Sequence, residues 1–168
     1  SKLEDHKVEL SHEAFDIRQL AEEILSITQI RAEEVGITIH YEDCGKNIRH
    51  PYIYGSPLHV RQIFVNILSN AIKYNKPDGE IFVKIESKKC TKKKIFYTCT
   101  ITDTGIGMSR EFLQHLFEPF VQEKVDARSV YYGTGLGMAI VKSLVDMMHG
   151  MIDVVSRPGE GTTFEVTI

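Results

Sequence analysis

The sequence contains few cysteines, no excess of basic residues and no long apolar run. Its three cysteines include no C-x-x-C pair, so we expect neither a disulfide framework nor a zinc site, and reduced thiols favour the cytoplasm. The formal net charge of −3 argues against a general nucleic-acid binder. No apolar segment has membrane-spanning length, and no signal-peptide pattern opens the chain. These absences predict a globular domain that contacts neither nucleic acid nor, directly, a membrane.

Positive charge is concentrated in one short segment, residues 88–94, which contains five lysines. The flanking runs are typical of strands, so the simplest interpretation is a solvated hairpin loop. The alternative is a patch for a partner or for nucleic acid. Residues 1–12 are predicted to be the end of a linker, and residues 13–168 to form one domain.

Hydrophobic periodicity predicts a mixed α/β domain. Helices are expected at about 16–35, 56–74, 109–116 and 136–149, and strands at 37–41, 52–54, 80–87, 95–103, 151–156 and 162–168. Asp16 and Ser109 are predicted N-caps, and Ser56-Pro57 is typical of an N-cap followed by the first helical residue. Residues 117–133 show no period and are expected to form a long loop. The elements predict two layers, with helices on one face of a largely antiparallel sheet.

Two glycine-rich segments carry the first chemical signal. Asp103 ends an apolar strand. Its carboxylate could accept a hydrogen bond from an amino group such as that of adenine. Gly105 and Gly107 would leave room beside it for a flat base. An ordinary turn aspartate is the alternative. Residues 133–137 form a G-x-G-x-G segment that opens a helix, where main-chain N–H groups favour phosphate. It is neither a G-x-G-x-x-G fingerprint nor a P-loop, and it could also serve only a tight turn.

The helix predicted over 56–74 carries the second signal. Gln62, Asn66, Ser69, Asn70 and Lys73 fall on a different side from its apolar face. A solvated stripe is the simplest alternative, but asparagine is a poor helix former and repeating it in mid-helix costs stability. An amide oxygen is a suitable hard ligand for Mg²⁺, and a lysine adds charge near phosphates. Together with the glycine segments, this face predicts a nucleotide site.

In this order the motifs resemble the catalytic ATP-binding (HATPase_c) domain of sensor histidine kinases, a branch of the GHKL superfamily shared with gyrase, heat-shock chaperone and mismatch-repair ATPases. The similarity runs from about residue 13 to the end and rests on the N box, the first G box, the F box, the second G box and a final glycine motif, at 66–74, 103–107, 117–120, 133–137 and 159–164. Val121-Gln122 after the F box is similar to the same stretch in many hybrid kinases. The resemblance implies a Bergerat-type fold: an α/β (α+β two-layer) sandwich with a mixed, mostly antiparallel sheet, helices on one face and an ATP lid.

The resemblance also implies residue roles. Asp103 is expected to accept from the adenine amino group, helped by Thr162 through water, and Tyr74 to lie against the base or sugar. Asn70 is expected to bind Mg²⁺ and Lys73 to contact phosphate. The two methionines, Met108 and Met138, would be apolar walls of the pocket, and the main chain of residues 135–138 would hold the phosphates. The other residues expected to line the ATP site are Gly105, Gly107, Gly133, Thr134, Gly135, Leu136 and Gly137.

Asn66 distinguishes two branches of the superfamily. The hydrolysing relatives carry a glutamate there that activates water, whereas an amide cannot take a proton at neutral pH. With Asn66, Asn70 and Lys73 as its catalytic set, the domain is expected to pass the γ-phosphoryl group of ATP to another nucleophile. The alternatives are an ATPase that drives conformational change and a non-catalytic interaction domain.

The expected nucleophile is a histidine on the dimerisation (histidine-phosphotransfer) domain of the same parent protein, and the second partner is the receiver domain of a response regulator. None of the seven histidines of this chain, His12 included, lies in a full acceptor motif, so the acceptor is expected outside it. The resemblance implies a cytoplasmic domain and is compatible with a parent protein that is an inner-membrane sensor.

Overall fold

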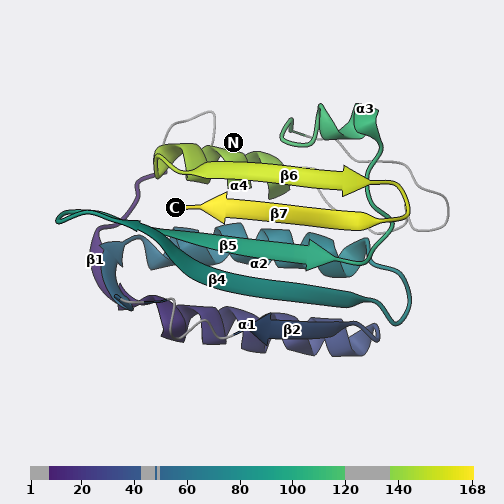
Figure 1. Ribbon diagram of the computed structural model, residues 1–168, viewed down its shortest axis with the longest axis horizontal. Helices are drawn as coiled ribbons and strands as arrows, with labels where there is room; N and C mark the ends of the chain where they lie inside the picture. The colour runs from purple at the N-terminus through teal and green to yellow at the C-terminus, as the bar shows by residue number, and fades with distance from the viewer. Residues whose placement is uncertain (1–7, 43–47, 49, 120–136) are drawn as a thin grey trace.

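The chain folds into two layers, as Figure 1 shows for the computed structural model, which describes residues 8–42, 48, 50–119 and 137–168. The helices are α1 (Ile17–Glu34), α2 (Pro57–Lys73), α3 (Arg110–Leu113) and α4 (Gly137–Met147). The strands are β1 (Glu13–Asp16), β2 (Thr38–Glu42), β3 (Tyr52–Gly55), β4 (Glu80–Cys90), β5 (Ile95–Asp103), β6 (Met151–Arg157) and β7 (Gly161–Thr167). Among these residues, no helix has the length and apolar character needed to cross a bilayer.

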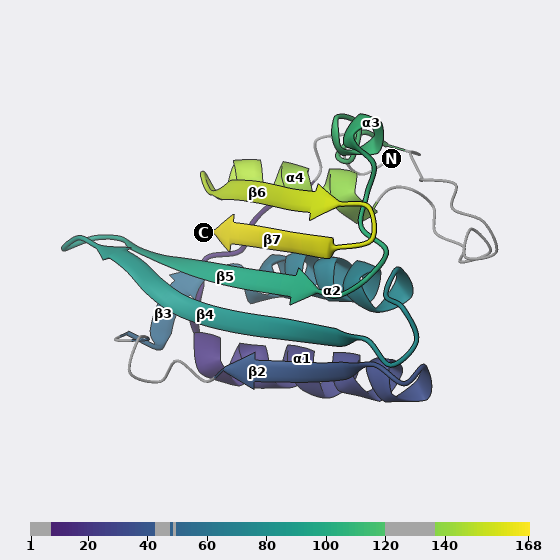
Figure 2. The ribbon, with the colours of Figure 1, turned by 45° about the vertical axis from the view of Figure 1, so that its right-hand side comes forward.

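Five strands form the main sheet, in the order β2-β4-β5-β7-β6. The pair β2–β4 is parallel, and the other three pairs are antiparallel. Helices α1, α2 and α4 lie side by side on one face of this sheet, with α2 in the middle (Figures 1 and 2). This arrangement confirms the predicted α/β two-layer sandwich with a mixed, mostly antiparallel sheet and helices on one face.

The core lies between the helices and the inner face of the sheet. On α2 the buried side chains recur at helical spacing: Val60, Ile63, Ile67, Leu68 and Ala71. On β5, Tyr97, Cys99 and Ile101 point into the same core at strand spacing. Burial raises the pKa of the Cys99 thiol to about 12, so this cysteine is an apolar core residue rather than a nucleophile.

Helix N-termini lie at all three predicted positions, and two of the three N-cap side chains make capping bonds. The Asp16 carboxylate accepts from the Arg18 N–H at 2.8 Å, and the Ser109 hydroxyl accepts from the Phe112 N–H at 3.1 Å. Ser56 and Pro57 also occupy the predicted N-cap and first helical positions of α2, but the Ser56 side chain makes no capping bond. The buried Ser56 hydroxyl instead lies 2.6 Å from His59 Nδ1 and accepts from the main-chain N–H of Ser11 at 3.1 Å.

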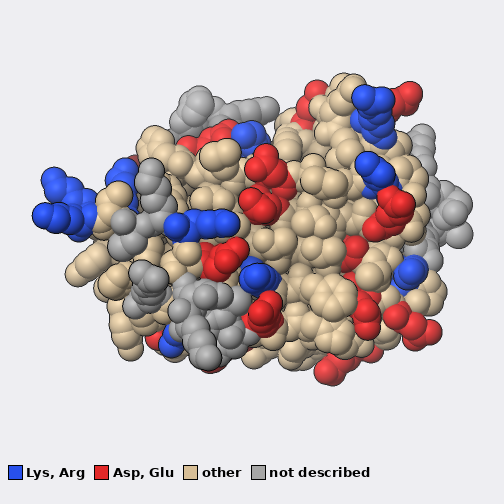
Figure 3. Space-filling view, in the orientation of Figure 1, with Lys and Arg blue, Asp and Glu red and all other residues tan. Residues whose placement is uncertain are grey.

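Two strands differ from the predicted pattern. Strand β1 was not predicted; it pairs with β3 in a separate two-stranded antiparallel sheet. Strand β4 continues to Cys90 rather than ending at Ser87, so the β4–β5 hairpin projects beyond the sheet at the left of Figure 1. The Thr91 hydroxyl accepts from the Lys94 N–H at 3.0 Å inside the hairpin turn. Basic side chains gather at this end in Figure 3, where Lys92, Lys93 and Lys94 are exposed.

Candidate functional site

Asp103 is the last residue of β5, and the residue is only 8% exposed. The carboxylate accepts from the Gly105 N–H at 2.8 Å. Burial raises the pKa of Asp103 to about 6, although main-chain hydrogen bonds from Gly105 and Thr162 act in the opposite direction. Because a carboxylate has about four acceptor positions, two main-chain donors leave capacity for an amino group. Asp103 is therefore a buried acceptor at the edge of the core.

The glycines after Asp103 are required by close packing of the main chain. A Cβ atom at Gly105 would lie 2.4 Å from the Tyr74 carbonyl oxygen, and one at Gly107 would lie 2.0 Å from the Arg157 carbonyl oxygen. Gly107 also has a φ of +69°, which disfavours other residues. The sequence predicted these glycines for a different reason, as space for a flat base. The structure shows that they fit the Asp103 segment between the end of α2 and the β6–β7 hairpin.

The β6–β7 hairpin brings Thr162 to Asp103, its direct partner in the register of β5 and β7. Thr162 is 6% exposed, and its hydroxyl lies 2.7 Å from the Ser156 hydroxyl. Ser156 also accepts from the Met108 N–H at 2.8 Å. Asp103, Met108 and Thr162 are thus gathered in one place, with Ser156 as a link that the sequence did not reveal.

Helix α2 presents its polar residues to two different neighbours. The side-chain oxygen of Asn66 would lie 3.9 Å from a Cβ atom at Gly137, the first residue of α4. Ser69, predicted on the same face, instead accepts from the Arg31 guanidinium of α1 at 3.3 Å. Because α2 lies between α1 and α4, the two edges of one polar stripe meet different helices. Asn66 faces the α4 side, and Ser69 does not belong to the candidate site.

The C-terminal end of α2 adds a cation and an aromatic ring. Lys73 Nζ lies 5.3 Å from the centroid of the Tyr74 ring, within the range of a cation–π interaction. Partial burial lowers the pKa of Lys73. The main-chain carbonyl of Asn70 accepts from the Tyr74 N–H at 3.0 Å, and that of Tyr74 accepts from the Ile106 N–H at 3.1 Å. The end of α2 is thereby joined directly to the segment that follows Asp103.

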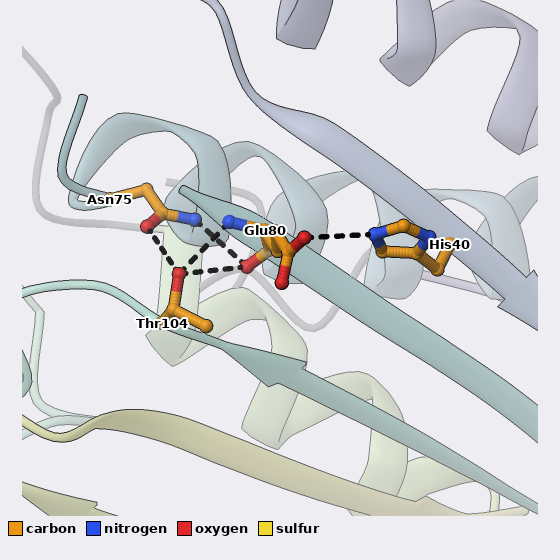
Figure 4. Close-up of polar contacts among 4 residues, drawn as sticks. All are labelled: His40, Asn75, Glu80 and Thr104. Carbon is orange, nitrogen blue, oxygen red and sulfur yellow. Dashed lines mark hydrogen bonds and ion pairs between the residues drawn. The ribbon is translucent and has the colours of Figure 1, made fainter. Parts of the chain in front are cut away.

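Sequence reasoning missed one further polar residue at this junction, Asn75. Asn75 is 7% exposed, and its side chain interacts with Thr104 and with the main chain of Glu80 (Figure 4). The sequence signal that could have revealed it is the position of Asn75 directly after Lys73-Tyr74, two predicted site residues. A polar side chain that is buried there needs hydrogen-bond partners. It was overlooked because the following residues are typical of an exposed turn.

The second glycine segment is described only in part. Gly133, Thr134, Gly135 and Leu136 lie outside the described residues, as do most of the predicted lid and the end of the F box. Gly137 begins α4, and Met138 is 6% exposed in the hydrophobic core. Met108 is half-buried and packs against the same core.

Comparisons with known proteins identify the family of this chain. Residues 55–168 match the family of histidine kinase-, DNA gyrase B- and HSP90-like ATPases, HATPase_c. The whole chain aligns at 34% identity with 19% of the non-motile and phage-resistance protein of Caulobacter vibrioides. It also aligns at 34% identity with 22% of the circadian input-output histidine kinase CikA of Synechococcus elongatus. The chain thus spans about a fifth of the length of these relatives.

A solved structure with the same fold is that of full-length ShkA in complex with AMPPNP. It matches with a TM-score of 0.76 and 28% identity, over 95% of this chain and 31% of that chain. The family match covers the segments that carry Asn66, Asn70, Asp103 and Thr162. The chain therefore belongs to the histidine kinase-, DNA gyrase B- and HSP90-like ATPases, and it is an ATP-binding catalytic domain of the two-component sensor histidine kinase type.

Proposed function

We propose that this domain binds Mg·ATP and transfers the γ-phosphoryl group to a histidine outside the chain. The observation that carries the proposal is the junction between α2 and the Asp103 segment, where the Ile106 N–H donates to the Tyr74 carbonyl at 3.1 Å. This junction holds a buried acceptor suited to a base close to the helix that bears Asn70 and Lys73. One molecule of ATP has a matching shape, with an amino group at one end and anionic phosphates at the other.

At the base end, Asp103 accepts a hydrogen bond from the adenine amino group, and Thr162 assists through water. Tyr74 lies against the base or the sugar, and Gly105, Gly107 and Met108 line the same part of the site. A buried carboxylate that lost this partner would remain incompletely satisfied. Purine triphosphates without the amino group are therefore expected to bind less tightly.

At the phosphate end, Asn70 holds Mg²⁺ and Lys73 contacts phosphate. The half-buried amide of Asn70 fits this role, since amide and phosphate oxygens are hard ligands of the kind that Mg²⁺ prefers. The bound ion would neutralise charge on the phosphate oxygens during transfer. Main-chain N–H groups of residues 135–138 hold the phosphate chain.

Asn66 makes the domain a transferase rather than a hydrolase. Its amide lies near the first turn of α4, on the proposed phosphate side of α2. An amide cannot act as the base that activates a water molecule at neutral pH. Positioning and charge neutralisation then supply most of the catalysis, and ATP remains intact until an acceptor arrives.

The acceptor is a histidine on the dimerisation domain of the same parent protein, and a response-regulator receiver domain takes the phosphoryl group afterwards. His12, whose ring stacks on Tyr54 with the two centroids 5.4 Å apart, lies outside a full acceptor motif and is not the proposed acceptor. We infer that the catalytic domain begins at about Glu13, where β1 starts, that residues 1–12 are linker, and that the domain acts in the cytoplasm.

A phosphotransfer assay tests the proposal. The domain is mixed with the dimerisation domain of its parent protein and ATP labelled on the γ-phosphate. We expect acid-labile, base-stable phosphate on the dimerisation domain, and little free phosphate when that domain is omitted. Steady-state release of phosphate by the isolated domain, at a rate equal to that of transfer, would instead indicate an ATPase that drives conformational change.

A further inference from the structure

Asn75 lies at the centre of a closed set of hydrogen bonds (Figure 4). Its side-chain nitrogen donates to the Glu80 carbonyl at 3.2 Å, and the Glu80 N–H donates to the Thr104 hydroxyl at 2.9 Å. The Thr104 hydroxyl in turn donates to the Asn75 side-chain oxygen at 3.3 Å. The same oxygen accepts from the Lys76 N–H at 2.9 Å. A side chain at position 75 must therefore both donate and accept, which an amide can do.

This set joins the end of α2 and the start of β4, where Asn75 and Glu80 lie, to Thr104, which lies 24 to 29 residues further along the chain. Asn75 follows α2, Glu80 begins β4, and Thr104 follows Asp103. The packing is close, because a Cβ atom at Gly79 would lie 2.1 Å from the Asn75 side-chain oxygen, and one at Gly105 would lie 3.0 Å from Asn75 Cα. The main chain of Asn75 thus packs closely against Gly105, and its side chain bonds to Thr104, so Asn75 contacts the segment that follows Asp103 in two ways.

We propose that Asn75 is a positioning residue for the base end of the nucleotide site. Acting through Thr104, it fixes where Asp103 and Gly105 lie relative to α2, which carries the residues of the phosphate end. The inference rests on the proposed role of Asp103 in binding adenine. Asn75 is buried, so it acts on the nucleotide through Asp103 rather than by touching it.

Thr104 offers a gentler test than Asn75, whose removal could unfold the domain. The Thr104→Val change keeps the β-branched shape and deletes the hydroxyl, whereas Thr104→Ser keeps the hydroxyl and serves as the matched control. Thr104 is half-buried, so water can replace its hydroxyl as acceptor for the Glu80 N–H. The change should therefore alter the placement of Asp103 more than the stability of the fold.

The experiment is a calorimetric titration of the domain with Mg·ATP and with Mg·purine riboside triphosphate, which lacks the 6-amino group. We expect Thr104→Val to weaken ATP binding by about three- to tenfold, the range for one hydrogen bond. Binding of the purine analogue should change by less than about twofold, and Thr104→Ser should bind both nucleotides like the parent domain. Asn75→Ala, if it folds, should weaken ATP binding at least as much as Thr104→Val.

Three outcomes would overturn the inference. Thr104→Val could bind ATP as tightly as the parent domain. It could lower the thermal midpoint while leaving the preference for ATP over the purine analogue unchanged, which would indicate a purely structural role. Asp103→Asn could retain full ATP affinity, in which case the adenine assignment fails as well. Lost affinity in Asp103→Asn with none lost in Thr104→Val would refute the role of Asn75 alone.

Discussion

The two ends of β5 differ sharply in how they use polar residues. At one end Asp103 is buried, and main-chain donors from two segments bond to its carboxylate. At the other end the hairpin exposes Lys92, Lys93 and Lys94, and Thr91 bonds with Lys94 inside the turn. The ends are about 25–30 Å apart along the strand. A polar residue held by several elements indicates a site more strongly than a denser group of exposed charges.

The largest expected effect concerns stability at the Asp103 end. The pKa of Asp103 is about 6 in the fold and near 3.8 in the unfolded chain, so the folded state binds its proton more tightly. Asp103 should therefore lower the free energy of unfolding of the nucleotide-free domain by about 2 kcal/mol as pH rises from 4 to 6.5. Urea unfolding across this range measures the effect, and Asp103→Asn should remove it. Identical pH profiles for the two proteins would contradict the burial of this carboxylate.

The next effect concerns ATP affinity. Asp103→Asn should weaken binding by about ten- to a hundredfold, because it removes a hydrogen bond to a charged acceptor. Lys93→Ser, at the other end of β5, should leave the affinity unchanged within a factor of about two, since it alters only an exposed charge. Calorimetric titration with Mg·ATP measures both variants. Equal losses of ATP affinity in Asp103→Asn and Lys93→Ser would contradict the functional difference between the two ends of β5.

Two glycines of the β6–β7 turn sharpen the comparison further. Gly161 and Gly159 both have positive φ, of +83° and +79°, so alanine is strained at either position. A Cβ atom at Gly161 would lie 2.1 Å from the Asp103 carbonyl oxygen, whereas one at Gly159 meets nothing within 4 Å. Gly161→Ala should therefore cost about 1–3 kcal/mol more than Gly159→Ala in urea unfolding. Equal costs would show that the hairpin does not pack closely on Asp103.

The smallest effect is expected at the lysine-rich turn. Changing Lys92, Lys93 and Lys94 together to serine removes charges that are exposed to solvent. The thermal midpoint and ATP affinity should both stay near those of the parent domain. Differential scanning calorimetry and ATP titration test this expectation, and a clear loss of ATP affinity would place the hairpin within the functional site.

Much of the fold could be predicted because the large elements carry strong periodic patterns. Helix α2 and strand β5 each bury one face, so local spacing was sufficient. Strand β1 was missed because its four residues have no such pattern and depend on pairing with β3, far along the sequence. The end of β4 was missed because its lysines are typical of a loop.

The candidate site was predicted only where its residues are close together in sequence. Asp103, Gly105 and Gly107 form one local motif, so their sequence alone indicated a special turn. Asn75 and Ser156 were missed, since their importance arises from partners on other segments, Thr104 and Met108. Such contacts depend on the register of strands, which local patterns do not specify.

The most direct test of the account is a titration followed through the main-chain amide signals of the isotopically labelled domain in solution. On addition of Mg·ATP, the signals of Gly105 and Thr162, whose main chains contact the Asp103 carboxylate, should shift strongly while those of the lysine-rich turn stay in place. Unchanged signals at Gly105 and Thr162, with ATP bound elsewhere, would contradict the assignment of this buried carboxylate as the adenine acceptor.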